Sequence, residues 1–455
     1  MPDATPRSGL KSLLTLRDEL NKAIDEFAAS NEPLVALDDL SQPAAASFAT
    51  PPVRQIVATG KEIVTLVHGQ GGLFELGFMY HLPGTLRVAI EAHVVETLKA
   101  AASNGKEALH VDEIAKSSNI DPKKLGRILR LLASYHIFRE VDLDVFANNR
   151  NSLFLDTGKA VDELKATDDF YSGTNGIAAL IAHVADDSMK GAACLAEIVL
   201  HEETASSYSA SKTAVTHAIN HNGPIWDFYA QPGNERLMSR FASAMKAAGV
   251  VQGQGGQSLL NGFPFPSLAK GSTIVDVGSG VGAVSLELAD AFPDLNFILQ
   301  DRSEVIKGPA QALWQDKEPN DLESGRIKLM PHDYFEPQPV KDAELYLMRF
   351  IIHDLPDADA RKVLAQLAAA AGPSSRLLLI EQTYDELPAC EGPMTSFPYI
   401  MDMQMLVALN SQERTVEQYR HLARGAGWEL VKAWKAAPEG QHAMLKHYEF
   451  RLAKA

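Results

Sequence analysis

The sequence predicts an α/β protein in which a mainly helical N-terminal half precedes a doubly wound domain built on a parallel sheet. Before residue 250 the apolar residues recur at helical spacing, and after Gly271 four apolar runs alternate with helical stretches. The chain has 455 residues, of which 46% are hydrophobic and 22% charged. This length and composition allow roughly two or three globular domains.

We predict four regions along the chain. Residues 1–60 form an N-terminal extension, with a helix at 10–29 and a linker around Gln42–Ala44 and Thr50–Pro52. Residues 61–160 resemble a winged helix: a helix at 86–100, a second helix beginning at Pro122 after the cap Asp121, and a short hairpin within 135–149. Residues 161–250 form a helical connection, and residues 251–455 form the sheet domain.

Charge and cysteine content exclude several classes of protein. The net charge of −16 disfavours binding to nucleic acid. The would-be recognition helix also carries core-like Ile128, Leu131 and Leu132, so we interpret the winged-helix region as a packing and dimerisation module. Cys194 and Cys390 form no CxxC pattern, which argues against a disulfide framework or a structural zinc site. No secretory signal or run of 18 apolar residues occurs, so we expect a soluble cytoplasmic protein that does not enter a membrane.

The strongest local motif is the loop DVGSGVG at 276–282, which follows a predicted strand at 272–276 and leads directly into a helix. Glycines permit positive φ and close approach of a ligand, and the helix start offers free N–H groups. The glycine spacing is GxGxG rather than the GxGxxG of dinucleotide sites. Asp301, 19 residues after Gly282, ends the next strand, where a carboxylate can accept protons from both ribose hydroxyls. The pattern indicates a Rossmann-like domain that binds a nucleoside.

The segments VDVGSGVG, LQDRSEVI, HDYFEP, YLMRFIIHDLPD, LLLIEQ and LNSQERT resemble, in order and spacing, the O-methyltransferases of the plant caffeic-acid and flavonoid type. The chain is similar to fungal members of that group, which act in secondary metabolism. The resemblance covers roughly residues 75–450. It implies a class I S-adenosylmethionine-dependent O-methyltransferase without a metal, and a homodimer formed through the N-terminal helices. It also implies that residues 161–250 shape the substrate pocket and that residues 251–455 are the catalytic domain.

The resemblance assigns cofactor contacts residue by residue. Asp301 takes the place of the ribose-binding acid, and Asp333 with Tyr334 stands on the adenine side. Arg349 replaces the lysine usual in plant members, which keeps the charge but changes the geometry of the donor. The predicted cofactor-binding residues are Asp276, Gly278, Gly280, Gly282, Asp301, Arg302, Asp333, Tyr334 and Arg349.

By resemblance His353, just after a predicted strand, is the general base, and Glu381 and Glu413 are the carboxylates that flank it. A phenol has a pKa of about 10 and an imidazolium about 6.5, so complete proton transfer before attack is uphill by roughly 5 kcal/mol. Positioning can contribute about 7–11 kcal/mol, whereas an aliphatic alcohol would be a poor match for this base. We therefore expect a phenolic acceptor. A surface ion pair between Glu413 and Arg414 remains the alternative for Glu413.

Candidate substrate contacts are Met245, Met401, Met405, Asn410 and Asp354, although methionines at helical spacing are also typical of a core. His332, His421 and His447 are interpreted as packing residues. Two other functions stay open. One is a methyltransferase-like pericyclase or dehydratase that uses the cofactor without methyl transfer, against which the complete His–Glu–Glu set argues. The other is a winged-helix regulator, against which the acidic charge argues.

Overall fold

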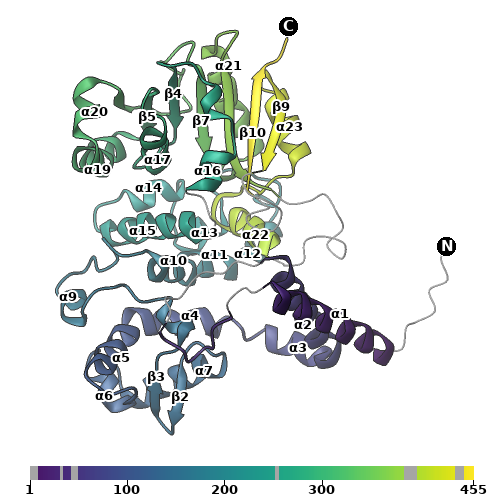
Figure 1. Ribbon diagram of the computed structural model, residues 1–455, viewed down its shortest axis with the longest axis vertical. Helices are drawn as coiled ribbons and strands as arrows, with labels where there is room; N and C mark the ends of the chain where they lie inside the picture. Colours follow the sequence, from purple (N-terminus) through teal and green to yellow (C-terminus); the bar gives the residue numbers. More distant parts are fainter. Residues whose placement is uncertain are drawn as a thin grey trace. The chain divides into compact units, whose positions relative to one another are not determined.

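The computed structural model describes residues 9–30, 34–41, 50–251, 256–383, 397–435 and 445–454 (Figure 1). The chain forms two compact units, Met1–Ala196 with Ala214–Val251, and Glu197–Thr213 with Gln252–Ala455. The predicted subdivision into four regions is finer than this division. The part of the predicted linker at 42–44 and Cys390 lie outside the described residues.

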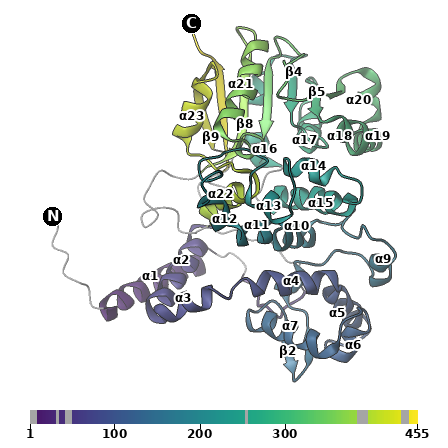
Figure 2. The same cartoon turned by 180° about the vertical axis from the view of Figure 1, so that it is seen from behind.

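The first unit begins with helices α1 (Gly9–Ala29), α2 (Pro51–His68) and α3 (Gln70–Leu76). Helix α1 agrees with the predicted helix at 10–29 and packs against α2 (Figure 2). The prediction of a linker at Thr50–Pro52 is wrong for the two prolines, because they form the first turn of α2. Proline is well suited to that position, since its missing N–H would have no partner there and its φ is already helical.

The structure contains the second helix and the hairpin that were predicted within residues 61–160. Helix α7 (Pro122–Ser134) begins after Asp121, whose side chain accepts a hydrogen bond from the Lys124 N–H at 3.1 Å. Strands β2 (Arg139–Asp142) and β3 (Val145–Ala147) form the predicted hairpin, and β1 (Leu109–His110) pairs with β3. Leu132 is fully buried, as expected for a packing helix.

The prediction of one helix over 86–100 is wrong. The structure has α4 (His81–Glu91) and α5 (Val94–Ser103), separated at His93, whose φ of 54° is left-handed and ends the helical path. Ile90 and Val94 on either side of the break lie in the same core. The helical spacing of apolar residues therefore continues from α4 into α5, and the sequence pattern does not reveal the break at His93.

The remaining elements of the first unit are short, apart from α15, which packs against α10. They are α6 (Val111–Ala115), α8 (Arg150–Leu153), α9 (Val161–Lys165), α10 (Ile177–His183), the π-helical turn η1 (Val184–Ser188), α11 (Met189–Ala193), α13 (Ala214–Ala218), α14 (Ile225–Tyr229) and α15 (Glu235–Val251), with α12 (Leu195–Val199) at the boundary between the units.

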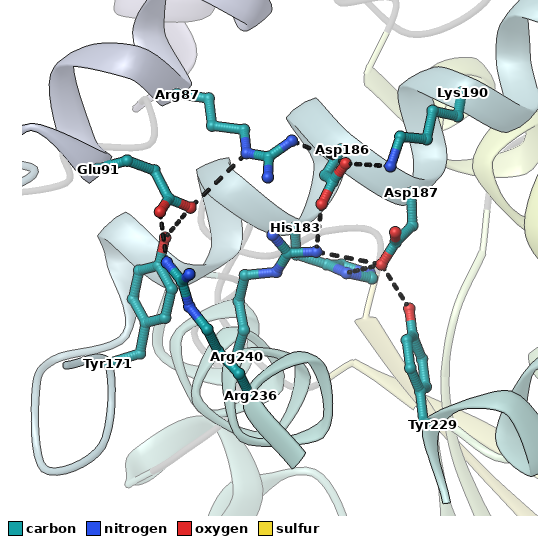
Figure 3. Close-up of polar contacts among 10 residues, drawn as sticks. All are labelled: Arg87, Glu91, Tyr171, His183, Asp186, Asp187, Lys190, Tyr229, Arg236 and Arg240. Carbon is teal, nitrogen blue, oxygen red and sulfur yellow. Dashed lines mark hydrogen bonds and ion pairs between the residues drawn. The ribbon is translucent and has the colours of Figure 1, made fainter. Parts of the chain in front are cut away.

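A buried ionic network joins several of these helices (Figure 3). The π-helical turn brings Asp186 and Asp187, both 3% exposed, toward Arg240 of α15. The Arg240 Nη2 atom lies 2.8 Å from Asp186 Oδ2 and 3.2 Å from Asp187 Oδ2. Arg87 of α4 and Lys190 of α11 each lie 2.7 Å from Asp186 Oδ1. Buried charges persist when they are paired in this way, so the network fixes how α4, η1, α11 and α15 pack together.

The second unit is built on a seven-stranded sheet in the order β6-β5-β4-β7-β8-β10-β9. Its strands are β4 (Thr273–Val277), β5 (Asn296–Asp301), β6 (Ile327–Pro331), β7 (Leu345–Arg349), β8 (Arg376–Gln382), β9 (Trp428–Lys435) and β10 (Leu445–Leu452). Strands β4 to β8 are parallel, which confirms the predicted α/β fold. The sheet is not parallel throughout, because β10 runs antiparallel to both β8 and β9.

Helices and short turns alternate with these strands, and side chains from both faces of the sheet enter buried cores, Val275 on one face and Ile274 on the other. They are α16 (Gln257–Asn261), η2 (Phe265–Ser267), α17 (Ala283–Ala291), α18 (Ser303–Val305), η3 (Ile306–Ala310), α19 (Gln311–Lys317), α20 (Pro319–Ser324), η4 (Ile352–Asp354), α21 (Asp357–Ala370), α22 (Phe397–Leu409) and α23 (Val416–Arg424).

The strand order places a topological switch point between β4 and β7. The chain passes from β4 outward to β5 and β6, and then returns to β7 on the other side of β4. Ligands of doubly wound sheets bind at the carboxyl ends of the strands at such a point. The loop after β4 and the loop after β7 meet at this edge. Among the described residues, no helix is long and apolar enough to span a membrane.

Candidate active site

The glycine loop follows β4 directly. Gly278, Gly280 and Gly282 have φ angles of 73°, 57° and 86°, which side chains rarely adopt. A Cβ on Gly278 would lie 2.5 Å from Ile351 Cδ1, and a Cβ on Gly282 would lie 2.2 Å from Leu299 Cδ2. The loop therefore needs glycine both for its backbone conformation and for its packing against the neighbouring segments.

Two carboxylates support this loop. Asp301, at the end of β5, accepts hydrogen bonds from the N–H groups of Gly280 and Arg302, each at 2.8 Å. Burial raises the pKa of Asp301 despite these bonds. Asp276 is 2% exposed and accepts a hydrogen bond of 2.6 Å from the hydroxyl of Ser285 on α17. Burial raises the pKa of Asp276 to about 6, so its carboxyl group takes up a proton more readily than a surface aspartate.

The other predicted cofactor residues lie at the ends of β6, β5 and β7. Asp333 is exposed and accepts a hydrogen bond of 2.9 Å from the Phe335 N–H. Tyr334 is half-buried, and burial raises the pKa of its hydroxyl. Arg302 is exposed and forms an ion pair of 2.6 Å with Glu304. Arg349 is half-buried at the end of β7, where burial lowers its pKa.

His353 lies in the turn η4, just after β7 and therefore on the same edge of the sheet as the glycine loop. Its Nδ1 atom is 3.0 Å from Glu413 Oε1, and its Nε2 atom is 3.3 Å from Asp354 Oδ1. The ring is thus placed between two carboxylates, of which Glu413 is 2% exposed. Such a carboxylate at Nδ1 holds a proton on that nitrogen and fixes the orientation of the ring.

The charges around His353 change its proton affinity. Burial alone would lower the pKa of His353, but the negative charges of Glu413 and Asp354 and the hydrogen bond to Glu413 outweigh it and raise the pKa to about 10. Burial raises the pKa of Glu381 to about 7 and that of Asp354 to about 6. The two carboxylates next to the ring therefore favour its protonated form.

Glu381, the last acid of β8, contacts the backbone that leads to His353 rather than its ring nitrogens. Its Oε1 atom accepts hydrogen bonds from the N–H groups of Ile351 at 3.2 Å and Ile352 at 2.8 Å. Its Oε2 atom has no hydrogen-bond partner among the described residues. The two glutamates thus differ in geometry, since Glu413 contacts the imidazole and Glu381 supports the turn that carries it.

The candidate substrate residues are spread over both units. Met401 and Met405 lie on α22, the first half-buried and the second buried. Asn410 has a φ of 54°, and its amide donates to the carbonyl oxygens of Ser209 at 2.8 Å and Lys212 at 2.9 Å. Met245 lies on α15 of the first unit and is 42% exposed. Asn410 is therefore already used to fasten the segment 209–212.

Sequence reasoning missed several residues that support the site. Asp402 of α22 accepts a hydrogen bond of 2.9 Å from the Glu413 N–H. The hydroxyl of Ser411 donates to the carbonyl oxygen of His353. The alternative of a surface ion pair between Glu413 and Arg414 is wrong, because both side chains are buried. In the part of the chain that the structure describes, no group of three or more His, Cys, Asp or Glu residues could hold a metal ion.

The doubly wound sheet carries the glycine loop, Asp301 and the His353–Glu413 pair on one edge, an arrangement typical of class I methyltransferases. The O-methyltransferase domain family matches residues 193–429, and the O-methyltransferase dimerisation domain family matches residues 74–155. The chain therefore belongs to the S-adenosylmethionine-dependent O-methyltransferases.

The relatives agree with the predicted fungal resemblance. An O-methyltransferase of Armillaria gallica is 36% identical over 375 residues, which covers 77% of this chain and 78% of that protein. 4-O-methyltransferase 1 of Phanerochaete chrysosporium is 34% identical over 388 residues, with 80% and 81% covered.

Two solved structures share the fold. OxaC in complex with SAH and oxaline has a TM-score of 0.72 at 21% identity and covers 98% of this chain and 100% of its own. A pericyclic reaction enzyme has a TM-score of 0.70 at 19% identity, with 97% and 100% covered. At these identities the likeness shows the fold alone and does not separate methyl transfer from the pericyclic alternative.

Proposed function

We propose that this O-methyltransferase moves the methyl group of S-adenosylmethionine to a phenolic hydroxyl of a small aromatic molecule, with His353 as general base. The observation that carries this proposal is the bond between His353 Nδ1 and Glu413 Oε1 on the same sheet edge as the glycine loop. In the same proposal residues 61–160 serve dimerisation, 161–250 shape the substrate pocket, and 251–455 form the catalytic domain.

The residues around the glycine loop fit the nucleoside part of the cofactor. A Cβ on Gly280 would meet no protein atom within 4 Å, so a ligand can approach the loop backbone closely at this residue. Asp301 already accepts two N–H bonds, and a carboxylate has about four acceptor positions, which leaves room for ribose hydroxyls. Asp333 and Tyr334 would contact the adenine, and Arg302, Arg349 and Asp276 complete the site. When bound there, S-adenosylmethionine supplies a methyl group activated by a positively charged sulfur.

The acceptor hydroxyl would bind at Nε2 of His353. Asp354 Oδ1 occupies this position, 3.3 Å from Nε2, and the Asp354 side chain is 26% exposed. Asp354 would turn away toward the acceptor's other polar groups when the hydroxyl enters. Glu413 keeps the proton on Nδ1, so Nε2 is the nitrogen that accepts the hydroxyl proton. Glu381 holds the turn below the ring through its two backbone bonds.

The proton affinity of His353 favours a phenol as acceptor. The charge of Glu413 makes the ring a stronger base than an unperturbed histidine, and the ring accepts the hydroxyl proton from its neutral form. The uphill transfer of roughly 5 kcal/mol expected for an unperturbed histidine is therefore smaller next to Glu413. An aliphatic alcohol would still hold its proton far too tightly. Met401 and Met405 are proposed to contact the aromatic ring, and Asn410 to support their helix.

Transfer of a labelled methyl group tests this proposal. Purified protein is incubated with S-adenosylmethionine carrying a labelled methyl group and a panel of phenols and aliphatic alcohols. We expect label on a phenol with the wild type and with His421→Gln, a substitution at an exposed histidine of α23, and a loss of at least about 10²-fold in kcat with His353→Gln. Near wild-type turnover of His353→Gln would refute the role of the base. Bound cofactor without methyl transfer to any acceptor would favour a pericyclase or dehydratase.

The assembly is proposed to be a homodimer formed through the N-terminal helices. The match of residues 74–155 to the O-methyltransferase dimerisation domain supports this assembly. Leu73 and Phe74 of α3, each 74% exposed, offer apolar surface that a second subunit could cover. Light scattering at micromolar concentration should give twice the mass of the 49.4 kDa chain, and a monomer would contradict this part of the proposal.

A further inference from the structure

Two loops of the second unit are joined at consecutive residues. Segment 411–414 lies against segment 352–357, which carries His353. The Ser411 hydroxyl donates a hydrogen bond to the His353 carbonyl oxygen, and Glu413 contacts the His353 ring. Segment 411–414 therefore contacts both the backbone and the ring of His353, the proposed base.

Arg414 makes the most extensive of these contacts. Its side chain is 1% exposed, and its Nη1 and Nη2 atoms donate to the carbonyl oxygens of Ile352 and Leu355, each at 2.8 Å. Its Nε and Nη2 atoms also donate to Asp357 Oδ1, at 3.1 and 2.8 Å. The guanidinium thus binds the backbone one residue before His353 and two residues after it.

This geometry depends on the shape of the guanidinium group. Its planar fork directs several N–H donors to fixed positions, whereas a lysine ammonium is a single compact donor on a flexible chain. A lysine at this position would keep the positive charge but could not reach Ile352 O, Leu355 O and Asp357 together. A buried cation with all these partners also leaves little freedom to the backbone between them.

We propose that Arg414 is a positioning residue that holds the backbone on both sides of His353, so that the ring faces the acceptor hydroxyl. This inference rests on the proposed role of His353 as the base. Arg414 itself touches neither the acceptor nor the cofactor in this account. Its effect on the reaction passes through the orientation of His353, and its absence should lower kcat rather than weaken cofactor binding.

Four variants separate this role from a merely structural one. Arg414→Lys keeps the charge, and Arg414→Met removes it. Asp357→Asn weakens the ion pair but leaves both carbonyl contacts. Arg361→Met is the matched control, because Arg361 pairs with the same carboxylate of Asp357 at 3.5 Å while its own side chain is 43% exposed.

We measure kcat, the KM for S-adenosylmethionine, the dissociation constant of S-adenosylhomocysteine and the thermal midpoint of each variant. Arg414→Lys should lower kcat by on the order of 10²-fold, as a misplacement of about 1 Å does, with KM and the dissociation constant within about threefold of the wild type. Asp357→Asn should lose less than about tenfold, and Arg361→Met should be unchanged. A Lys variant with wild-type kcat, or Asp357→Asn as impaired as Arg414→Lys, would overturn the inference.

A spectroscopic measurement keeps the inference testable if Arg414→Met fails to fold. With ¹³C-labelled histidine, the ring signal of His353 is identified by its loss in His353→Gln. In folded Arg414→Lys this signal should shift or broaden while the signal of His421 stays in place. An unchanged His353 signal overturns the inference. Full turnover by His353→Gln would instead refute the proposed function, so the two failures are distinguishable.

Discussion

The substitution Glu413→Gln tests how the buried carboxylate controls His353. Two opposite unit charges about 4 Å apart attract each other by about 4 kcal/mol at an effective dielectric constant of about 20. At about 1.36 kcal/mol for each pKa unit, removing the charge should lower the pKa of His353 by roughly three, from about 10 to near 7. The glutamine amide can also donate to Nδ1, which would leave the proton on Nε2 and block the base.

The assay follows the His353 ring by NMR between pH 5 and 10.5 in protein containing ¹³C-labelled histidine, together with kcat. Glu413→Gln should move the titration midpoint down by about three pH units and lower kcat by about 10²–10⁴-fold. Glu417→Gln is the matched control, since this glutamate lies four residues further on and its side chain is 58% exposed. A wild-type midpoint near 6.5, or a midpoint unmoved by Glu413→Gln, would refute the reasoning.

The same charge pair makes stability depend on pH. The folded pKa of His353, about 10, exceeds the unfolded value of about 6.5, so its protonation stabilises the fold fully below about pH 6.5. This contribution is lost as pH rises through about 10. Glu381 and Asp354 have folded pKa values of about 7 and about 6, so both lose their protons mostly below the pH at which His353 titrates. The free energy of unfolding should therefore fall between pH 7 and 10 in the wild type and fall less in Glu413→Gln.

Three further predictions concern the cofactor loop and the first unit. Asp301→Ala should raise the dissociation constant of S-adenosylhomocysteine, measured by calorimetry, at least about tenfold, because a charge-assisted hydrogen bond contributes about 1.5–3 kcal/mol. Glu304→Ala, at an exposed neighbouring residue, is the control, and equal affinities of the two variants would contradict the assignment of Asp301 to the ribose. In urea unfolding, Gly282→Ala should lower the free energy of unfolding of the second unit by more than Gly280→Ala, because only the substitution at Gly282 would place a Cβ 2.2 Å from Leu299 Cδ2. Equal decreases would show that backbone strain alone matters. Arg240→Met should lower the free energy of unfolding of the first unit by about 3–5 kcal/mol, because it leaves Asp186 and Asp187 buried without their shared cation. Lys190→Met removes a side chain that is 55% exposed and should lower this free energy far less, and equal decreases in the two variants would contradict the proposed role of the network.

Strands β4, β5, β7 and β8 of the parallel part of the sheet were predictable because each is a mostly apolar run. Strands buried on both faces have this composition. Strand β9 is different, since WELVKAWK at 428–435 places charged residues along an edge strand that is largely exposed. Strand β10 places Glu449 in the sheet, where it pairs with Arg376 and accepts a hydrogen bond from Trp434. Neither strand has a clear periodic pattern of apolar residues, so the antiparallel edge was not predicted.

The active site was predictable only in part. The glycine loop and Asp301 follow from local spacing, but His353 and Glu413 are 60 residues apart in sequence, and their pairing came from the family resemblance. Composition alone favours a surface location for Arg414, because arginine is seldom fully buried. Its burial depends on the carbonyl oxygens of a turn distant in sequence, which no local pattern reveals.

The most direct test of the account is the distance from the sulfur of S-adenosylhomocysteine to Nε2 of His353 in a crystal structure of the complex. We expect the sulfur to lie over the glycine loop at roughly 5–7.5 Å from Nε2, a gap that accepts one hydroxyl oxygen in line with the methyl group. A His353 ring directed away from the nucleoside, or a gap filled by protein atoms, would contradict the account.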